Sequence, residues 1–288
     1  MHLDVELILL ALSPVFLFCV GAEYLHWRRN GHAEYYSVAD TLCNAALALL
    51  HQGADKLAWF LTLPLFAWLS LQHPLFHVVP GWQSTLTLFV LQDFLYYWFH
   101  RASHRMRWLW AAHSVHHSST RMNFSTAFRQ SLMYPVAGMW LFWLPLAWIG
   151  FPPQSVIAVV LLNLAFQFFV HTRLFGRLGP LEYLFNTPQI HRCHHARNPR
   201  YIDKNYAGVL VIWDRLFGTY VDEDSNDPCQ FGTVKPVNSF NPLRVTFAEW
   251  GDMLRDLVWA RGWRQKLAML AAPPERVAEM VARGHAES

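Results

Sequence analysis

The sequence predicts an all-α, polytopic membrane protein of four or five helical spans, with a cytoplasmic helical cap that carries clusters of histidine. The first observation is the composition: 53% of the 288 residues are hydrophobic and only 15% are charged, which is unusually apolar for a soluble domain. The second is a series of apolar runs of about 20 residues, the length that crosses about 30 Å of hydrocarbon. The third is that eight of the sixteen histidines fall into three tight clusters beside these runs.

Four apolar runs are long enough to cross a bilayer with some tilt. They cover residues 7–27, 82–99, 132–149 and 155–171. A fifth apolar region, residues 38–72, is interrupted by His51, Asp55 and Lys56, so it is one long bent helix, a hairpin, or an interfacial helix followed by a span. The N-terminus, MHLDVELILL, has neither a positive leading segment nor a small-residue cleavage site, so we expect the first run to be retained.

The distribution of Lys and Arg gives the expected orientation. The loops at residues 73–81 and 150–154 contain neither residue type, whereas the opposite loops are basic. These loops contain Arg28, Arg29, Arg101, Arg105, Arg107, Arg121 and Arg129. We therefore expect the histidine clusters and the C-terminus on the cytoplasmic side of a bacterial inner membrane or an equivalent membrane. The net charge of +3 fits basic loops facing anionic lipid, and it does not indicate a nucleic-acid partner.

The histidine clusters have the spacing of metal ligands. H-x-x-x-H places two imidazoles one turn apart on one helix face, and H-x-x-H-H offers positions i, i+3 and i+4. The clustered residues are His100 and His104, then His113, His116 and His117, then His191, His194 and His195. Because one ion takes about four ligands, eight histidines fit two metal ions better than one. Neutral imidazole suits zinc, copper, iron and nickel, so the ligand type leaves the metal open.

Two stripes of polar residues run along the expected spans towards these clusters. The first consists of Asp93, Tyr97, His100 and His104, and the second of Asn163, Gln167 and His171. At about 1.5 Å per residue, Asp93 lies roughly 10 Å from His100, so we expect it to orient another ligand rather than bind the same ion. His171 ends its stripe at the same depth as the clusters, and we expect it to be a ninth ligand.

The remaining histidines and the cysteines show no such pattern. The histidines at positions 2, 26, 32, 51, 73, 77 and 285 have no ligand spacing and are treated as background. Cys19, Cys43, Cys193 and Cys229 are scattered and indicate no disulfide framework. A thiolate of Cys193 could join the third cluster, but three histidines already supply that segment, so we expect its side chain to point away.

Three short motifs, HRASH, WAAHSVHHSS and IHRCHH, follow one another on one side of the apolar spans. Together they resemble the fatty acid hydroxylase or sterol desaturase superfamily, integral-membrane enzymes with a histidine-rich dinuclear iron centre. Two longer segments, HSVHHSSTRMNFSTAFRQS and FQFFVHTRLFGRLGPLEYLFNTPQIHRCHHARNPRYIDKNYAGVLVIWDRLFGTY, resemble the branch that contains the alkylglycerol monooxygenases. The resemblance implies N-terminal membrane spans in residues 1–90, a histidine-box catalytic domain in residues 91–223 and a C-terminal cytoplasmic segment in residues 224–288.

Carried over residue by residue, the ligand positions of the family fall on the eight clustered histidines and on His171. The resemblance also matches polar positions around these boxes, which it implies to hold imidazole N–H groups or the cytoplasmic loop. These positions are Asn123, Asp203, Asn205 and Asp214, beside Asp93 from the polar stripe. A second set, aromatic residues near the clusters, either lines a hydrophobic tunnel or forms interfacial belt and core. This set is Trp98, Phe99, Trp108, Trp110, Phe124 and Phe128.

The resemblance implies an oxygenase in which two nonheme irons use O₂ as co-substrate to oxidise a C–H bond of a lipid. Hydroxylation or desaturation is implied, with cleavage of an alkylglycerol ether lipid as the leading case; sterol, carotenoid, fatty acyl and ornithine-lipid substrates stay open. The sequence has no heme-binding domain, flavin fingerprint or nicotinamide fold, so we expect a separate electron donor. Tetrahydrobiopterin, which the animal alkylglycerol enzymes use, is one candidate reductant.

Two other classes of protein also use histidine ligands in membranes. An intramembrane zinc hydrolase needs a glutamate base beside its ligands, as in H-E-x-x-H, whereas Arg101 follows His100 in this sequence. A metal transporter or a membrane cytochrome holds its ligands within the spans, whereas these clusters fall at the ends of the apolar runs. The sequence therefore favours the oxygenase over both.

Overall fold

The computed structural model describes residues 5–286, and side chains within residues 11–282. His2 lies outside the described residues, as does the side chain of His285. The described chain is helical, and its β-type pairing is limited to isolated bridges. The predicted all-α class is therefore confirmed.

Twelve α-helices and four 3-10 helices occur within residues 5–286. The five long α-helices are α1 (Val5–Arg29), α2 (Val38–Gln72), α3 (Trp82–Arg105), α7 (Pro153–Val170) and α10 (Pro242–Trp259). The shorter ones are α4 (Arg107–His117), α5 (Tyr134–Ala137), α6 (Leu144–Ile149), α8 (Pro188–His195), α9 (Ile212–Leu216), α11 (Trp263–Ala271) and α12 (Pro274–Ala286). The 3-10 helices are η1 (Ala33–Tyr35), η2 (Phe124–Phe128), η3 (Met139–Trp143) and η4 (Gly179–Tyr183).

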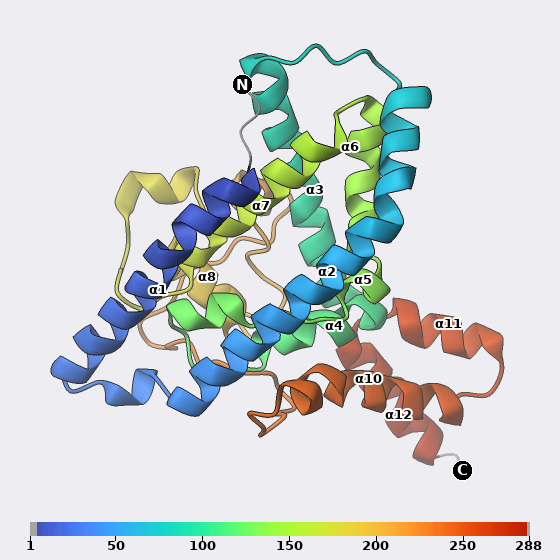
Figure 1. Ribbon diagram of the computed structural model, residues 1–288. Coiled ribbons are helices and arrows are strands. Elements are labelled where there is room, and N and C mark those ends of the chain that lie inside the picture. The colour runs from blue at the N-terminus through green and yellow to red at the C-terminus, as the bar shows by residue number, and fades with distance from the viewer. Residues whose placement is uncertain (1–4, 287–288) are drawn as a thin grey trace.

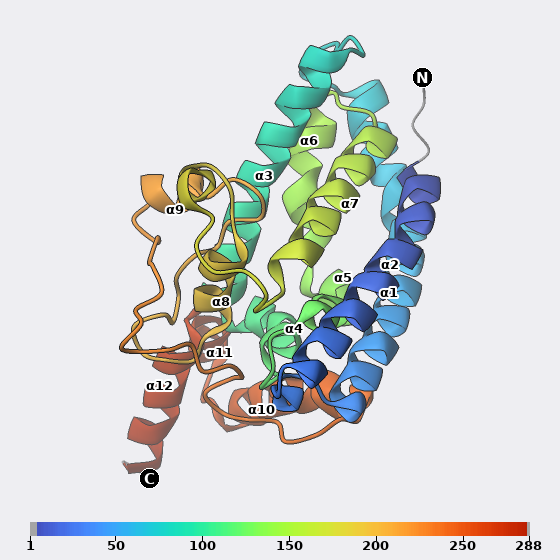
Figure 2. The same ribbon diagram turned by 90° about the vertical axis from the view of Figure 1, so that its left-hand side faces the viewer.

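The apolar segments run alternately between the two ends of the molecule (Figures 1 and 2). In chain order they are α1, α2, α3, the segment made of α5, η3 and α6, and α7. Helix α7 packs against both α1 and α3, and α2 packs against α6. Judged by length and composition alone, α7 is the one helix among residues 5–286 that is able to cross a bilayer. The number of spans therefore stays a prediction.

Residues 38–72 form one helix, so the hairpin and the two-helix alternatives were wrong. Ser37 caps the N-terminus of α2 by accepting a hydrogen bond from the backbone N–H of Asp40. Figure 1 shows that α2 changes direction along its length. Pro64 lies inside the helix, where it removes a backbone donor and favours such a bend.

Residues 132–149 do not form the continuous helix expected of a simple span. They divide into α5, η3 and α6. Gly138 ends α5 in the left-handed region, with φ of 89°, and Pro145 lies in the first turn of α6. A residue with positive φ and a proline without a backbone donor both interrupt a helix. The apolar run therefore consists of three short helical pieces instead of one helix.

The two loops without Lys or Arg meet at one end of the molecule, as the predicted orientation requires. The backbone N–H groups of Leu75 and Phe76 donate to the carbonyls of Trp148 and Ile149. Gly150 has φ of 118°, and a Cβ there would lie 2.2 Å from the carbonyl oxygen of Phe76. This contact between the loops therefore requires glycine at position 150.

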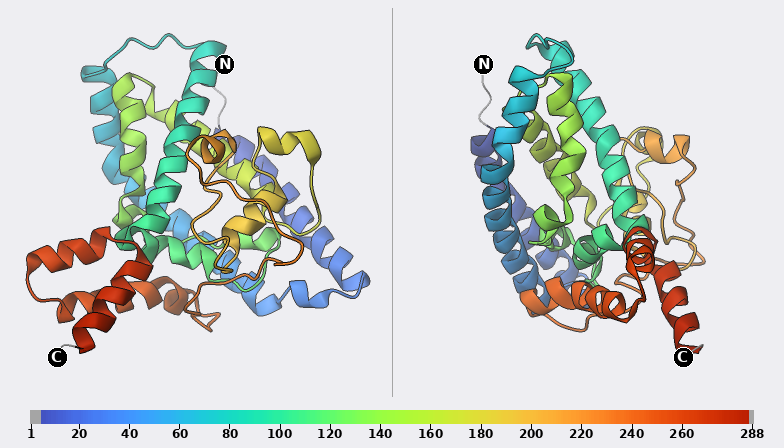
Figure 3. Two further views of the ribbon diagram at one scale, coloured as in Figure 1. Left: turned by 180° about the vertical axis from the view of Figure 1, so that it is seen from behind. Right: turned by 90° about the vertical axis from the view of Figure 1, so that its right-hand side faces the viewer.

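The opposite end of the bundle is closed by α4 and the C-terminal helices. Helix α10 packs across α4, with the Trp108 and Trp250 rings 5.0 Å apart, and α11 and α12 also contact α4. Figure 3 shows α11 and α12 projecting from this end. The amphipathic stretches predicted at residues 246–259 and 274–283 lie in α10 and α12, whereas α11 was not predicted.

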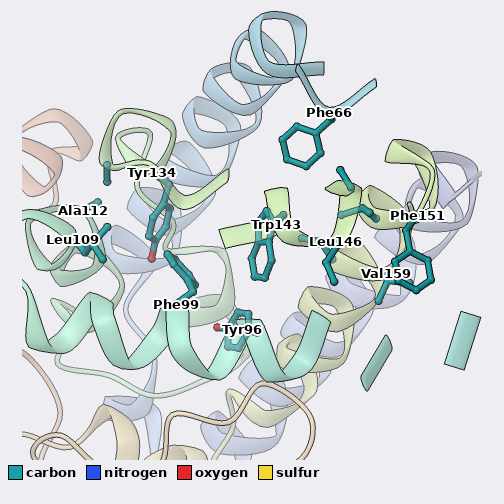
Figure 4. Packing of buried hydrophobic residues seen from close by; sticks show 14 of the residues in the cluster. Phe66, Tyr96, Phe99, Leu109, Ala112, Tyr134, Trp143, Leu146, Phe151 and Val159 are labelled. Carbon is teal, nitrogen blue, oxygen red and sulfur yellow. The ribbon is translucent and has the colours of Figure 1, made fainter. Parts of the chain in front are cut away.

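A buried aromatic core holds the broken segment against α3. Figure 4 shows Tyr96 and Phe99 projecting from α3 towards Tyr134 and Trp143. The Phe99 ring lies 6.1 Å from that of Tyr134 and 6.0 Å from that of Trp143. All four side chains are buried. The core therefore fixes the C-terminal half of α3, where the first two clustered histidines lie.

Candidate metal centre

All nine predicted ligands gather into two groups at the end of the bundle closed by α4. The first group is His100, His104, His113, His117 and His194, and the second is His116, His171, His191 and His195. Within each group, one nitrogen from every side chain lies within 4.8 Å of the others, and all nine side chains are buried.

The two groups cut across the clusters seen in the sequence. In α4, His113 and His117 are one turn apart and join the first group, whereas His116 is rotated by about 100° and joins the second. In α8, His194 belongs to the first group and His191 to the second. The groups adjoin, because the rings of His117 and His195 stack at 4.4 Å.

The Nε2 atoms in the first group converge at distances too short for ordinary ring packing. The Nε2 atom of His113 lies 3.0 Å from that of His100 and 3.1 Å from that of His117. The Nε2 atoms of His117 and His194 are 3.1 Å apart. The Nε2 atom of His104 is buried with no hydrogen-bond partner among the described residues. A buried polar atom without a partner is rare in proteins, and a bound metal ion would supply one.

The second group has the same arrangement. The Nε2 atom of His171 lies 3.1 Å from that of His116 and 3.0 Å from that of His191, and His191 and His195 are 3.1 Å apart. His171 follows the last residue of α7, while His116 comes from α4 and the other two from α8. Three separate helices therefore converge on one point.

The opposite ring nitrogens reveal which tautomer these histidines hold. The Nδ1 atoms of His116 and His171 lie 3.0 Å from the carbonyl oxygen of Arg129 and 2.6 Å from that of Gln167. A carbonyl only accepts, so Nδ1 carries the proton and Nε2 keeps a lone pair. The two Nε2 lone pairs then face each other at 3.1 Å, and neither atom can donate. A cation between them resolves this contact, as it does in metal sites.

In the first group, too, the Nδ1 atoms have partners outside the group. The Nδ1 atoms of His100 and His194 lie 2.8 Å and 2.9 Å from the carbonyl oxygens of Tyr206 and Lys204. The Nδ1 atom of His113 lies 2.7 Å from the hydroxyl of Tyr134. These contacts orient the rings with Nε2 towards the centre of the group.

The electrostatics of the site also favour metal binding. Burial lowers the pKa of His116 to about 4. Burial, reinforced by neighbouring imidazoles, holds the pKa values of His117, His194 and His195 well below the usual range. The rings are therefore neutral at physiological pH, which is the form that binds a metal ion. Nine imidazoles in two groups fit two ions of a metal that accepts nitrogen ligands.

Comparison with known proteins identifies the part of the chain that holds this site. Residues 85–219, from α3 to the loop after α9, match the family model described as fatty acid hydroxylase. This segment is similar to the fatty acid hydroxylase family over its whole length. It contains all nine histidines of the two groups.

The relatives of the chain include several alkylglycerol monooxygenases. The Homo sapiens enzyme is 49% identical over 170 residues, which cover 58% of this chain and 37% of the relative. The Xenopus tropicalis enzyme is 44% identical over 195 residues, covering 67% and 42%. The Caenorhabditis elegans enzyme is 36% identical over 250 residues, covering 84% and 48%. The superfamily and branch resemblance is thus confirmed, although the chain spans less than half the length of these relatives. No solved structure matches the chain significantly.

Asp214 lies one peptide away from the candidate ligand His100. Its buried carboxylate accepts the backbone N–H groups of Tyr206 and Ala207, both at 2.8 Å, and the hydroxyl of Thr219 at 2.6 Å. The carbonyl of Tyr206 accepts from His100. Asp214 therefore holds the peptide that orients a candidate ligand.

Asp93 supports the same loop from the side of α3. Its Oδ1 atom accepts from the backbone N–H of Val209 at 2.8 Å, and its Oδ2 atom accepts from that of Leu210 at 3.0 Å. Its other two donors are the side chains of Asn163 and Trp213. Asp93 therefore contacts the loop whose Tyr206 carbonyl accepts from His100, rather than an imidazole, and we propose that it positions the metal site indirectly.

Replacing Asp93 by asparagine is expected to lower metal affinity or turnover by about 10 to 100-fold while the protein stays folded. The amide offers one acceptor oxygen where the carboxylate offers two, so one pair of N–H donors loses its partner. Metal titration of the purified variant measures the effect. Asp252→Asn is the control, since Asp252 pairs with the exposed side chains of Lys235 and Arg255. Equal metal affinity in the two variants would show that Asp93 contributes only to helix packing.

The remaining predicted support residues have different contacts. Asp203 lies beside His104, with Oδ1 3.7 Å from Nδ1, and pairs with Arg105. Asn205 donates to the carbonyl of Ile190 at 3.0 Å, so it fastens the loop to α8. Asp203 and Asn205 both have positive φ, of 60° and 58°, which Asp and Asn tolerate better than most residues.

Asn123 does not contact an imidazole. It caps η2, accepting from the backbone N–H of Ser125 at 3.0 Å, and it donates to the carbonyl of Tyr35 at 2.8 Å. Helix η2 ends directly before Arg129, whose carbonyl accepts from His116. We propose that Asn123 acts on the site only through the path of this loop.

Sequence reasoning missed two supporting residues, Tyr134 and Asn186. Tyr134 lies between the hydrophobic core and His113, and no spacing relates it to the histidine clusters. Asn186 donates to the carbonyl of Ala207 at 2.8 Å, and its Nδ2 atom lies 3.5 Å from Nδ1 of His191. Only Asn186 carried a signal in the sequence, because it is an amide shortly before the third histidine cluster.

Cys193 lies apart from both histidine groups. It is fully buried in a cluster with Ala196 and Tyr201, against which Cys229 packs. All four cysteines are free in the described chain. Its side chain thus points away from the candidate ligands, as expected.

Proposed function

We propose that this chain is an O₂-dependent, nonheme diiron membrane oxygenase that oxidises a C–H bond of a lipid. The observation that carries the proposal is the pair of adjoining, buried histidine groups, whose Nε2 lone pairs converge while Nδ1 is fixed from outside. Iron is favoured over other metals because the groups lie in a fatty acid hydroxylase domain. The residues of each group would hold one ion.

When bound, the two irons would supply the activation of O₂ and the oxidation of the C–H bond. The protein contributes fixed ligand positions, because Nδ1 contacts to carbonyls leave little freedom for the rings. It also contributes a dry site, since all nine histidines are buried. Exclusion of bulk water prevents side reactions that would compete with oxidation of the lipid carbon.

The proposed substrate class is an ether lipid of the alkylglycerol type. It is supported by relatives named alkylglycerol monooxygenase, which align with this chain over less than half of their own length. Sterol, fatty acyl and ornithine-lipid substrates, and desaturation in place of hydroxylation, are the alternatives within the superfamily. A separate electron donor is part of the proposal, with tetrahydrobiopterin as one candidate.

We propose that the apolar segments cross a membrane five times and that the histidine groups face the cytoplasm. Large apolar side chains on α2 point outwards, among them Leu49, Phe60 and Leu71, which are 73%, 76% and 75% exposed. Such side chains are favourable in contact with lipid and costly in water. The basic loops at the histidine end support the orientation.

The first experiment is metal analysis of the detergent-purified protein, with Mössbauer spectroscopy after growth on iron-57. We expect about two coupled irons per chain. Two zincs would call for anaerobic reconstitution with ferrous iron before activity is tested on alkylglycerols by mass spectrometry. A protein that holds no metal, before or after reconstitution, would contradict the proposal.

A further inference from the structure

Two segments on either side of α8 in the sequence form a lobe on the side of the bundle. They are residues 175–185, which include η4, and residues 207–218, which include α9; we call them the side lobe. The backbone N–H of Val211 donates to the carbonyl of Leu184 at 3.0 Å, and Phe185 and Leu210 form an isolated antiparallel bridge. None of the apolar runs recognised in the sequence includes these residues.

The side lobe lies beside the middle of α3, away from the histidine end (Figure 2). The indole of Trp213 donates to Oδ2 of Asp93 at 3.0 Å, and its ring lies 5.1 Å from that of Phe94. Asp93 is near the midpoint of the 24-residue helix α3. At about 1.5 Å per residue, it is roughly 10 Å from His100 along the helix axis. Helix α9 is therefore at the depth of the central part of α3.

The side lobe also reaches the middle of α7. A Cβ at Gly208 would lie 2.8 Å from Oδ1 of Asn163, so this close approach requires glycine. The rings of Phe166 and Phe185 are 6.4 Å apart. Asn163 is near the middle of the 18-residue helix α7. Because α3 and α7 are both proposed to cross the membrane, the side lobe falls within the depth of the bilayer.

The exposed surface of the side lobe is apolar. Apart from Arg177 and Arg215, its exposed positions are glycine, proline and large apolar or aromatic residues. The large exposed side chains are Phe175, Leu178, Leu181, Tyr183, Leu184 and Leu216. A contiguous surface of this kind is costly in water and favourable against lipid.

The charged residues of the side lobe are also placed as a lipid environment requires. Its acids, Glu182 and Asp214, are both buried and hydrogen-bonded. Its exposed charges are Arg177 and Arg215, and the Arg215 guanidinium lies 3.8 Å over the ring of Tyr220. Long arginine side chains can extend from the apolar layer to the lipid headgroups.

The irregular backbone of the side lobe finds its hydrogen-bond partners inside the protein. Asp93 accepts from the N–H groups of Val209 and Leu210, and the N–H of Asn186 donates to the carbonyl of Val209 at 2.8 Å. At membrane depth, backbone that is not helical is tolerated only where the protein supplies such partners. This requirement gives a physical reason for an acid in the middle of α3.

The part of the same segment that lies nearer the histidine groups has a different surface. Its exposed positions are mostly polar or charged, and they include Arg197, Arg200, Asp222, Ser225, Asn226 and Gln230. The change from an apolar to a polar surface within one segment is expected where a chain passes from lipid into water.

We propose that the side lobe is immersed in the cytoplasmic leaflet and that its exposed face contacts lipid acyl chains. Helix α8, which carries His191, His194 and His195, lies between the two segments of the lobe along the chain. The part of the protein that supplies these candidate ligands is therefore embedded in the bilayer at its side, rather than resting wholly on the membrane surface. The inference rests on the proposed membrane crossing of α3 and α7.

The test is photo-crosslinking of the full chain in vesicles of phosphatidylcholine and phosphatidylglycerol. The vesicles contain a phosphatidylcholine with a diazirine in the middle of one acyl chain, and mass spectrometry locates the labels. We expect labels on residues 175–185 and 212–217 and on α2, with far fewer on residues 222–230. Labels on α2 without labels on the side lobe would overturn the inference and favour a protein partner at this surface. Absence of labels from α2 as well would contradict the proposed membrane crossing itself.

Two variants that add the same charge give a matched comparison. Leu216 is 69% exposed on the side lobe, and Val234, in the loop before α10, is 73% exposed. Leu216→Glu places a carboxylate among acyl chains, so we expect recovery of folded protein in vesicles to fall about tenfold. Val234→Glu should be recovered like the wild type. Equal recovery of the two variants would contradict lipid contact at Leu216, and the wild-type crosslinks test the inference even where Leu216→Glu does not fold.

Discussion

His116→Ala is expected to remove the metal from the second histidine group and to reduce lipid oxidation to background. His116 supplies one of four nitrogens in that group, and its Nε2 atom lies 3.1 Å from that of His171. Alanine leaves a gap where a buried, oriented nitrogen stood. Because the group contains no fifth histidine among the described residues, we expect about half of the iron to be lost. Elemental analysis and a turnover assay measure both effects. We expect His194→Ala to act likewise on the first group.

The control for this prediction is His73→Ala. His73 ends α2 at the opposite end of the molecule, where it packs against Trp68 with ring centroids 4.4 Å apart. We expect this variant to keep both irons and its activity, so that loss in His116→Ala cannot be assigned to histidine removal in general. Full iron content and activity in His116→Ala would contradict the assignment of His116 as a ligand.

The second large effect is expected at Arg129, where replacement by leucine should lower the free energy of unfolding by about 3–5 kcal/mol. Arg129 is 2% exposed, and its guanidinium donates to Asp40 at 3.2 Å and to Asn44 at 2.8 Å. Without Arg129, the carboxylate of Asp40 is buried with no opposite charge. The variant should also hold metal less tightly, because the carbonyl of residue 129 accepts from His116. Thermal melting and metal titration in detergent measure the two effects.

Arg121→Leu is the matched control, because this arginine of the same loop donates to the carbonyl of Glu34 at an exposed position. Its expected change is within about 0.5 kcal/mol, as for other surface substitutions. The double variant Asp40→Leu, Arg129→Leu should recover much of the lost stability, since no charge is then left unpaired. A single Arg129→Leu variant as stable as Arg121→Leu would show that the buried pair contributes little.

The helical fold was largely predictable because local pattern determines where helices form. Residues 38–72 and 155–171 are long apolar runs, and each forms one helix with few changes at its ends. Residues 132–149 have the same composition but contain Gly138 and Pro145, which interrupt the helix. An unbroken helix over this run is wrong because these two residues interrupt it, while its crossing of a membrane stays a prediction. Composition alone left open how many helices cross a membrane.

The candidate ligands were predictable because an i, i+4 pair of histidines shares a face of a helix wherever that helix lies. Their division into two groups was not predictable. His116 and His117 are adjacent in the sequence yet belong to different groups, since neighbouring residues point about 100° apart: His117 faces the histidines of α3, and His116 faces the histidine that follows α7. Such partners come from helix packing, which spacing along the chain does not record.

The sequence by itself determined the all-helical class, the nine histidines and their resemblance to a fatty acid hydroxylase domain. These features depend on residue type and on periodicity along the chain. The tertiary structure alone decided which imidazoles face one another, which carbonyls fix their tautomers, and that Arg129 is a buried partner of Asp40 rather than a surface charge. It also decided that Trp213 contacts Asp93 in the middle of α3. The reason is that each of these contacts joins residues distant in the chain, and only the packing of the helices brings them within reach.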